Sequence, residues 1–330
     1  MFITQSSEMK KPKVVYITGC LGFIGSYITN DCLQKGWFVK GIDKITYAAN
    51  TELLQTFGKY KNFSFSQIDI NDLEFLYDCD YIINVAAETH VGNSIISSKD
   101  FIQSNINGVQ RILELLREYR TENGHLPKLV HFSTDEVYGD IIEGSHKEHD
   151  LLKPSNPYSA TKAAADMLIQ AWSRTYGIPY IIVRPTNNYG MGQYVEKLIP
   201  KTIKYLNLGR KIPLHNNGEP IRNWLHAKDT SSAILTIIES NCDNEIFNIS
   251  GNLETKNIET VKKIISVYLN KRIGSIDINS YIDYDTKRSG QDVRYSLDDS
   301  KLKSLGWKPN ANFDQELKQI VRYYKHKFIW

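Results

Sequence analysis

The fold is decided by one stretch near the N-terminus, Val14-Val15-Tyr16-Ile17-Thr18-Gly19-Cys20-Leu21-Gly22-Phe23-Ile24-Gly25. An apolar β-type run ends in a GxxGxxG pattern, and a helical pattern begins at Phe23. Glycine is needed where a backbone turns tightly, approaches a phosphate, or lets a helix pack against a strand. A helix that starts here presents unpaired N–H groups and the positive end of its dipole to an anion. The stretch therefore predicts a strand, a phosphate-binding turn and a helix, with a simple glycine-bearing turn as the alternative.

Strand and helix patterns alternate from Lys13 to about Pro185. Val/Ile-rich runs between helical patterns are typical of a parallel sheet with helices on both faces. Right-handed crossovers between such strands produce the doubly wound, dinucleotide-binding Rossmann arrangement of the α/β class. We expect strands at residues 14–18, 38–43, 63–68, 81–86, 128–133 and 180–184, and helices at residues 23–35, 101–119 and 158–176.

The pattern changes after Pro185. Alternation weakens, turn signals such as Asn216-Asn217-Gly218 appear, and helical patterns cover residues 258–269 and 314–325. These features predict a smaller mixed α/β part that binds the substrate. We therefore expect a short disordered leader at residues 1–12, a Rossmann domain at residues 13–185, and a substrate-binding part at residues 186–330 that is interleaved with the Rossmann domain.

Composition and charge argue against several classes of protein. A net charge of +3 over 330 residues is too small to indicate nucleic acid or an anionic membrane as the main partner. The four cysteines have no CxxC spacing and the eight histidines form no HExxH, so we expect reduced thiols, a cytoplasmic location and no metal. No apolar run approaches the roughly 18 residues that span a bilayer, so we expect no membrane partner.

An acidic residue follows the second predicted strand at the position where a nucleotide ribose would bind. Asp43 lies 18 residues after Gly25, and a carboxylate there would bind the ribose hydroxyls. It favours NAD, because a carboxylate repels the extra phosphate of NADP, although the adjacent Lys44 weakens this inference. Asp69-Ile70 follows the third strand and is a candidate for holding the adenine. A loop-capping aspartate is the alternative there.

A tyrosine and a lysine lie one helical turn apart. Tyr158 and Lys162 therefore project from the same face of the predicted helix. The lysine charge would lower the pKa of the tyrosine and let it act as a base near neutral pH. A surface YxxxK on an amphipathic helix is the alternative, which the flanking Asn156-Pro157 and Ser159-Ala160 and the upstream glycine loop disfavour.

Two adjacent carboxylates follow the fifth predicted strand in Thr134-Asp135-Glu136. A polar turn that caps a helix is one interpretation of this tripeptide. However, parallel-sheet enzymes place reactive groups at the carboxyl ends of strands. Two carboxyl groups near an apolar site resist ionising together, which separates them into one acid and one base. Such a pair is suited to the elimination of water across two carbons.

With these elements in place, the chain resembles the nucleotide-sugar 4,6-dehydratases of the dTDP-glucose and UDP-glucose type, in the extended short-chain dehydrogenase/reductase family. The resemblance covers roughly residues 13–330. Its specific part is the Asp-Glu pair, because epimerases and decarboxylases of the superfamily usually carry Ser or Thr without it, and the inverting GlcNAc dehydratases carry Asp-Lys. The matching segments are Asp43-Lys44-Ile45-Thr46-Tyr47, Ala86-Ala87-Glu88-Thr89-His90-Val91, Ser133-Thr134-Asp135-Glu136-Val137-Tyr138-Gly139, residues 158–162, Asn187-Asn188-Tyr189-Gly190, Glu196-Lys197-Leu198-Ile199-Pro200, Ile221-Arg222-Asn223-Trp224-Leu225 and Gly306-Trp307-Lys308-Pro309.

The resemblance implies a three-stage reaction on a glucose linked to a nucleoside diphosphate. Tyr158 removes the C4 hydroxyl proton while hydride leaves C4 for NAD⁺, with Thr134 hydrogen-bonded to that oxygen. Glu136 then removes the C5 hydrogen, and Asp135 protonates the departing C6 hydroxyl. Hydride returns to C6 and C5 is reprotonated, so the product is a 4-keto-6-deoxy sugar, a step toward rhamnose or a related deoxysugar, and the cofactor stays bound.

The resemblance also implies two sets of binding residues and a homodimer formed through helices such as 101–119 and 158–176. The segment around Arg288 departs from the family pattern at Ser289 and Gln291, as does Arg184-Pro185 from the bacterial pattern, and these departures leave the choice of nucleotide open. The implied NAD contacts are Gly19, Gly22, Phe23, Ile24, Gly25, Asp43, Lys44, Thr46, Asp69, Ile70, Ala86, Ala87, Ser104, Tyr158, Lys162 and Asn188. The implied nucleotide-sugar contacts are Thr89, Thr134, Asn187, Lys197, Leu198, Arg222, Asn257 and Arg288.

Two other functions stay open at this point. A nucleotide-sugar 4-epimerase or decarboxylase of the same superfamily would use the same tyrosine and lysine, but the Asp-Glu pair argues against it. A non-catalytic NAD-binding protein could retain the fold. The complete set of tyrosine, lysine and both carboxylates argues against that second alternative.

Overall fold

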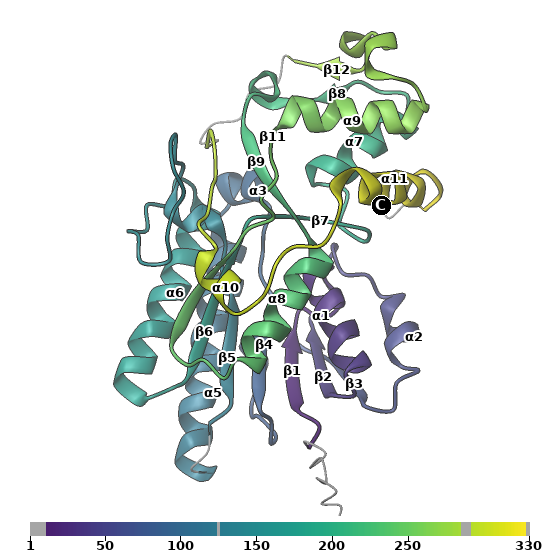
Figure 1. Cartoon of the computed structure of the whole chain (residues 1–330). Coiled ribbons are helices and arrows are strands. Elements are labelled where there is room, and N and C mark those ends of the chain that lie inside the picture. The colour runs from purple at the N-terminus through teal and green to yellow at the C-terminus, as the bar shows by residue number, and fades with distance from the viewer. Residues whose placement is uncertain (1–10, 124–125, 285–291, 328–330) are drawn as a thin grey trace, which may run out of the picture.

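The computed structural model describes residues 11–123, 126–284 and 292–327 (Figure 1). Most of the predicted leader, residues 1–10, and the candidate Arg288 with its neighbours lie outside these ranges. Within the described part of the chain, no helix has both the length and the apolar character needed to cross a membrane.

A seven-stranded sheet forms the centre of the molecule, and all of its strand pairs are parallel. Its order is β10-β6-β5-β4-β1-β2-β3, so the chain winds outward in both directions from β1 and β4. The predicted doubly wound Rossmann fold is therefore confirmed. The strands are β1 (Val14–Thr18), β2 (Phe38–Asp43), β3 (Phe63–Gln67), β4 (Tyr81–Asn84), β5 (Lys128–Phe132), β6 (Tyr180–Pro185) and β10 (Glu245–Ile249).

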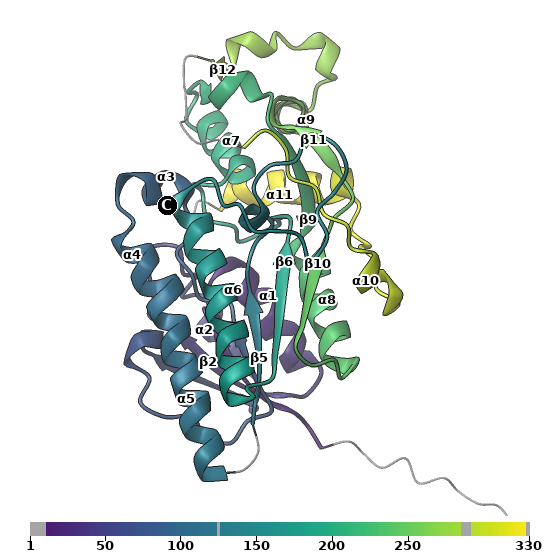
Figure 2. The same cartoon turned by 90° about the vertical axis from the view of Figure 1, so that its left-hand side faces the viewer.

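Helices cover both faces of this sheet (Figures 1 and 2). On one face, α1 (Phe23–Gln34) and α8 (Ala227–Glu239) pack on an apolar core. On the other face, α5 (Gly108–Asn123) and α6 (Pro157–Tyr176) lie side by side over a second core. Both faces are buried at the inner strands, which explains why strands such as β4 and β5 are largely apolar, whereas the edge strand β3 alternates Phe and Ser.

The predicted helix at residues 101–119 differs in detail from the observed one. It consists of α4 (Lys99–Ile102), a π-helical segment η2 (Gln103–Asn107) and α5. The wide turn places the buried Asn105 side chain between two other segments. Its Oδ1 accepts from the Glu88 N–H at 2.9 Å, and its Nδ2 donates to the Glu88 carbonyl and to Thr161 Oγ1, both at 3.0 Å. These partners are distant in sequence, so helix propensity gave no sign of the π segment.

A smaller part lies above the carboxyl ends of the central strands (Figure 1). It has a three-stranded sheet, β11-β9-β7, and its own apolar core. The chain leaves the large sheet after β6 and returns to it through α8 and β10, so residues beyond 185 contribute to both parts. The remaining elements are α2 (Leu53–Phe57), η1 (Ile70–Asp72), α3 (Val91–Ile96), η3 (Asp135–Tyr138), β7 (Asn187–Tyr189), α7 (Leu198–Asn207), β8 (Ile212–Pro213), η4 (His215–Gly218), β9 (Ile221–His226), β11 (Glu254–Lys256), α9 (Asn257–Leu269), η5 (Ile273–Ser275), η6 (Ile278–Ser280), β12 (Ile282–Asp283), α10 (Ser300–Ser304) and α11 (Phe313–His326).

Candidate active site

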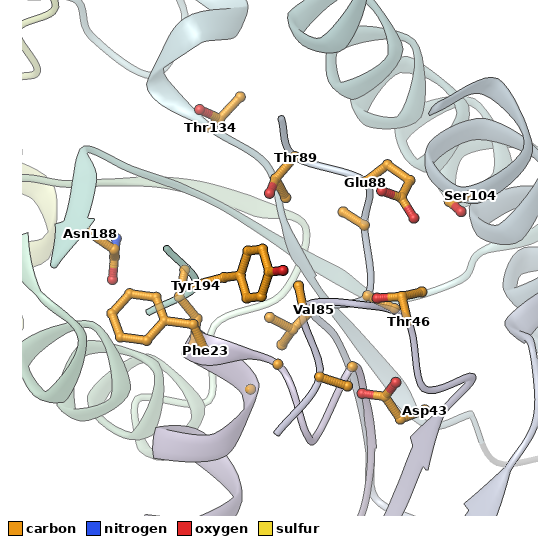
Figure 3. Close-up of a pocket in the computed structure, with 18 of the residues that line it drawn as sticks. Phe23, Asp43, Thr46, Val85, Glu88, Thr89, Ser104, Thr134, Asn188 and Tyr194 are labelled. Atoms are coloured by element: carbon orange, nitrogen blue, oxygen red, sulfur yellow. The ribbon is translucent and has the colours of Figure 1, made fainter. Parts of the chain in front are cut away.

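A cavity of about 300 Å³ lies at the carboxyl ends of the central strands, between them and the smaller part (Figure 3). This is the edge where open parallel sheets bind their ligands. Most of the residues singled out in the sequence line it: Gly19, Gly22, Phe23, Ile24, Gly25, Asp43, Lys44, Thr46, Asp69, Ile70, Ala86, Ala87, Thr89, Ser104, Thr134, Asp135, Glu136, Tyr158, Asn187, Asn188 and Lys197.

Four other candidates are described but do not line this cavity. Lys162 is buried on α6 behind Tyr158, with 3% of its surface exposed. Leu198 begins α7 and packs against the core of the smaller part. Arg222 lies on β9, and Asn257 begins α9. Arg222 is close enough to the carboxylate pair for its charge to lower the pKa of Asp135.

The glycine turn is shaped by close backbone approaches. Gly19 has a φ of +68°, and a Cβ there would lie 2.9 Å from the Ala86 Cα. A Cβ on Gly25 would lie 2.0 Å from the Gly19 carbonyl oxygen. Helix α1 begins directly after this turn, so its first N–H groups face the cavity side of the sheet. The result is a backbone cradle of the kind that holds a pyrophosphate.

Asp43 is held in place by the backbone on both sides. Its carboxylate accepts from the Leu21 N–H at 3.1 Å and from the Ile45 N–H at 2.8 Å. Burial raises the pKa of Asp43, and these two hydrogen bonds oppose the rise by favouring the charged form. A fixed acceptor beside the glycine turn fits the ribose of a dinucleotide.

Lys44 is engaged away from Asp43. Its Nζ donates to Ser104 Oγ at 3.1 Å and lies 3.4 Å from Asp69 Oδ2. Burial opposes the charge on Asp69, but hydrogen bonds from Asn71 and the nearby Lys44 lower its pKa. Lys44 is paired with Asp69, so part of its charge is already balanced. The lysine therefore weakens the inference that the cofactor is NAD, not NADP, less than its place beside Asp43 in the sequence implies.

The tyrosine and lysine are carried by the first turns of α6. Asn156 caps the helix, since its Oδ1 accepts from the Ser159 N–H at 2.9 Å, and Pro157 starts the first turn. The same Asn156 donates from Nδ2 to Glu136 Oε2 at 3.3 Å. One capping residue thus fixes both the helix that bears Tyr158 and the side chain of Glu136.

The charge states of Tyr158 and Lys162 differ from the expectation. Burial raises the pKa of the Tyr158 phenol far above its usual value, and Glu136 raises it further. Burial also lowers the pKa of Lys162 to about 8. The expected lowering of the tyrosine pKa by Lys162 is therefore absent from the protein alone, because both groups are removed from water and carboxylates lie near the phenol.

The tripeptide Thr134-Asp135-Glu136 has two roles, because Thr134 caps the short helix η3 and the next two residues form the carboxylate pair. Thr134 Oγ1 accepts from the Glu136 N–H at 3.3 Å and donates to Asp135 Oδ1 at 3.1 Å. Asp135 is 2% exposed, and burial followed by repulsion from Glu136 raises its pKa to about 8. Asp135 therefore holds a proton at neutral pH, which suits a general acid.

Several further residues line the cavity that the sequence reasoning did not select. Val85 and Glu88 follow β4, where the rule about strand ends could have found them. Tyr194 and Glu196 contribute from the segment before α7 (Figure 3). Tyr47 contacts both, with its ring centroid 5.1 Å from that of Tyr194 in an edge-to-face arrangement, and its hydroxyl donates to Glu196 Oε2 at 3.1 Å. Only the folded chain brings residues 47 and 196 together.

The fold and the cavity define an α/β protein of the dehydrogenase/reductase type. The chain belongs to the family described as GDP-mannose 4,6 dehydratase, whose model matches residues 16–320. A dTDP-glucose 4,6-dehydratase of Haemophilus influenzae is 40% identical over 94% of this chain and 97% of its own length. A trifunctional UDP-glucose 4,6-dehydratase, epimerase and reductase of Arabidopsis thaliana is 36% identical over 97% of this chain and 48% of its own length. The structure of DesIV, a dTDP-glucose 4,6-dehydratase from Streptomyces venezuelae with NAD and TYD bound, matches with a TM-score of 0.87 and 34% identity over 95% of this chain and 97% of that one.

Proposed function

We propose that this protein is an NAD-dependent hydro-lyase that converts a nucleoside-diphosphate glucose into its 4-keto-6-deoxy derivative. The observation that carries the proposal is the meeting, in one cavity, of Tyr158 with the carboxylate pair Asp135 and Glu136. A 4-epimerase needs a tyrosine base but has no use for a buried, protonated carboxyl group beside a second carboxylate. The relatives named dTDP-glucose and UDP-glucose 4,6-dehydratase support the same reaction.

The cofactor-side residues fit NAD. The cradle at Gly19 and Gly25 has no room for side chains, and Asp43 presents a fixed acceptor one strand away. Bound there, NAD⁺ would supply the redox chemistry, by accepting a hydride from C4 of the sugar and returning it to C6. Residues that would hold it also include Thr46, Ser104 and Asn188, all of which line the same cavity.

Tyr158 is the base for the first stage. It takes the proton of the C4 hydroxyl, and Thr134 donates a hydrogen bond to the same oxygen. In the protein alone the phenol strongly prefers to keep its proton. It therefore needs positive charge nearby when it works, and Lys162, one turn away on α6, is the protein's own source of that charge.

The carboxylate pair carries out the elimination. A ketone at C4 acidifies the neighbouring C5 hydrogen, and Glu136 takes that proton. Asp135 gives its proton to the C6 hydroxyl, which leaves as water while the C5–C6 double bond forms. Asp135 is suited to this step because its pKa of about 8 keeps it protonated until the leaving group needs the proton. Glu136 then returns its proton to C5 as hydride reaches C6.

Residues of the smaller part bind the nucleotide end of the substrate. Arg222 stacks on the Tyr295 ring, with its guanidinium carbon 4.7 Å from the ring centroid, and donates to the backbone carbonyls of Ile221 and Asp292. A guanidinium held this way keeps further N–H groups for a diphosphate. We propose the same role for Arg288, and sugar or nucleotide contacts for Thr89, Asn187, Lys197, Leu198 and Asn257. Thymidine and uridine diphosphates differ by one methyl group on the base, and both are candidates.

Incubation of the purified protein with NAD and either dTDP-glucose or UDP-glucose tests the proposal. We expect a sugar nucleotide lighter by one water in mass spectrometry, with the better substrate identifying the base. A product of unchanged mass with inverted C4 would instead identify an epimerase. No turnover of either nucleotide would favour a non-catalytic NAD-binding protein.

The Glu136→Gln variant tests the assignment of roles. We expect it to oxidise C4, seen as absorbance of reduced nicotinamide, but to release no water, because an amide cannot take the C5 proton. The matched control is Glu143→Gln, a change at an exposed glutamate nearby in the chain, which should turn over like the parent protein. Dehydration by Glu136→Gln at the parent rate would show that another group is the base.

We also propose a cytoplasmic homodimer that associates through the face of α5 and α6. Apolar side chains on and near this face are exposed, among them Ile102 at 43% and Met167 at 59%. A second copy that covers these side chains would remove them from water. Light scattering at several concentrations measures the mass and so tests the dimer.

A further inference from the structure

A buried ion pair lies directly behind the tyrosine and lysine of the site. Asp166 and Arg184 are 0% and 1% exposed. Asp166 Oδ2 accepts from Arg184 Nε at 3.0 Å and lies 2.9 Å from Arg184 Nη2. A guanidinium does not lose its proton in a protein, so an uncharged Asp166 would leave that charge buried without a partner. We therefore treat the pair as ionised.

The same carboxylate joins the two halves of the proposed catalytic machinery. Ser133 Oγ, directly before Thr134 at the end of β5, donates to Asp166 Oδ2 at 3.0 Å. Asp166 itself lies on α6 two turns after Tyr158 and one turn after Lys162, on the same face of the helix. The hydrogen bond from Ser133, together with that from Asn156 to Glu136, therefore ties the helix with the tyrosine and lysine to the segment with the carboxylate pair.

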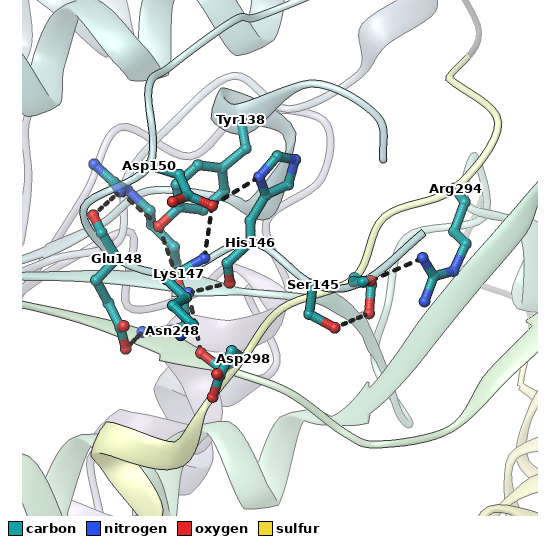
Figure 4. A network of polar contacts seen from close by, with 12 residues as sticks. Tyr138, Ser145, His146, Lys147, Glu148, Asp150, Asn248, Arg294 and Asp298 are labelled. Atoms are coloured by element: carbon teal, nitrogen blue, oxygen red, sulfur yellow. Dashed lines mark hydrogen bonds and ion pairs between the residues drawn. The ribbon is translucent and has the colours of Figure 1, made fainter. Parts of the chain in front are cut away.

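Arg184 is also held on its other side, by Tyr138 and Glu148, which Figure 4 labels. Its Nη1 donates to Tyr138 Oη at 2.7 Å and to the Glu148 carbonyl at 3.1 Å. The Tyr138 hydroxyl in turn donates to Asn248 Oδ1 on β10 at 2.9 Å. Because β6, β10 and the segment before α6 all hold Arg184, neither member of the ion pair can move without disturbing several elements.

Asp166 has one carboxylate oxygen left for Lys162. Among the described residues, its Oδ1 has no hydrogen-bond partner, although the atom is buried. Burial lowers the pKa of Lys162 to about 8, and the charge of Asp166 opposes that fall. Lys162 also acts on His131 on β5, and the carboxylate of Asp166 is influenced by both Arg184 and Lys162. Burial, helped by Lys162, lowers the pKa of His131 well below its usual value, so this imidazole is neutral.

We propose that Asp166 is a positioning residue that keeps Lys162 charged and holds α6 in register with the segment bearing Thr134. The positive charge of Arg184 offsets part of the effect that the negative charge of Asp166 has on Lys162. The inference rests on the proposed function only in assigning a use to the charged lysine. Its physical content is that two neighbouring buried charges act on Lys162 in opposite directions.

Two substitutions give opposite predictions. Asp166→Asn removes the negative charge and leaves Arg184 uncompensated, so Lys162 should lose its proton at a lower pH, by about one unit or more. Arg184→Gln keeps hydrogen-bond donors but removes the positive charge, so Lys162 should lose its proton at a higher pH. The readout is the chemical shift of the Lys162 side chain in lysine-labelled protein, assigned with Lys162→Met and followed against pH. Circular dichroism checks the fold of each variant.

The pH dependence of C4 oxidation, which precedes the step of Asp135, should move with the lysine in both variants. The proposal would be overturned if the titration of Lys162 were unchanged in both variants or shifted in the same direction in both. An ion pair with a purely structural role would not shift the titration of Lys162 in opposite directions in the two variants. If Asp166→Asn does not fold, the upward shift in Arg184→Gln still decides. Opposite lysine shifts in a protein that dehydrates no sugar nucleotide would uphold the electrostatic inference and refute the proposed function.

Discussion

Replacement of Asp135 by asparagine should stabilise the folded protein and do so increasingly as pH rises. The unfolded carboxyl group has a pKa near 3.8 and the folded one a pKa of about 8. The stability that Asp135 contributes is therefore fully present below pH 3.8 and is lost as pH rises toward 8. Each pH unit in that window corresponds to about 1.4 kcal/mol. Between pH 5 and pH 8, the advantage of Asp135→Asn should grow by up to about 4 kcal/mol, since asparagine has no proton to lose.

Urea unfolding followed by tryptophan fluorescence at the two pH values measures this difference directly. The parent protein and the variant share every other titrating group, so the double difference isolates position 135. Asp277→Asn, at an exposed site in the smaller part, is the control for the loss of one aspartate carboxyl group. The reasoning is refuted if the advantage of Asp135→Asn is equal at both pH values or reverses at pH 8. The variant should also release no water from substrate, because an amide is a poor proton donor.

Two further substitutions test the cofactor cradle and the π-helical segment. Gly25→Ala places a methyl group 2.0 Å from a backbone oxygen. It should weaken NAD binding, measured by calorimetry, and lower the free energy of unfolding by about 1–3 kcal/mol. The control Gly274→Ala, whose added Cβ meets no atom within 4 Å, should change neither quantity. Equal NAD affinity in both would show that the turn does not contact the cofactor. Asn105→Ala leaves buried polar groups without partners and should lower the free energy of unfolding by about 1–3 kcal/mol, while Asn107→Ala, whose side chain bonds Gln103 in the exposed part of the same segment, should change it little. Equal losses in the two asparagine variants would argue against the interior role of Asn105.

Six of the seven strands of the central sheet, β1 to β6, were predicted from the sequence, and β10 was not. Most of the predicted strands are buried on both faces. A strand such as β6, with all six residues buried, is apolar except for Arg184, whose charge is paired with Asp166. The glycine turn could also be predicted from the sequence, because a glycine is required at Gly25, where a side chain would collide with the backbone. The parallel, doubly wound class of the sheet followed from the alternation of strands and helices, whereas the order of the strands came from the structure.

Other features depended on contacts between distant segments. The π-helical turn at Asn105 exists because Glu88 and Thr161 meet it in space. The contact of Tyr47 with Glu196, a lining residue of the cavity, joins two loops that are almost half the chain apart. Periodicity reports which face of an element is apolar, but it contains no information on which loop lies opposite.

The sequence by itself determined the kinds of chemical group at the site: a tyrosine and a lysine one helical turn apart, two adjacent carboxyl groups at the end of a strand, and glycines before a helix. Only the tertiary structure decided which of these groups hold protons. Asp135 keeps a proton, Tyr158 resists losing one, and Lys162 is close to giving one up, because each is removed from water by segments that come from elsewhere in the chain. Charge state follows from burial and from neighbouring charges, and both are properties of the folded molecule.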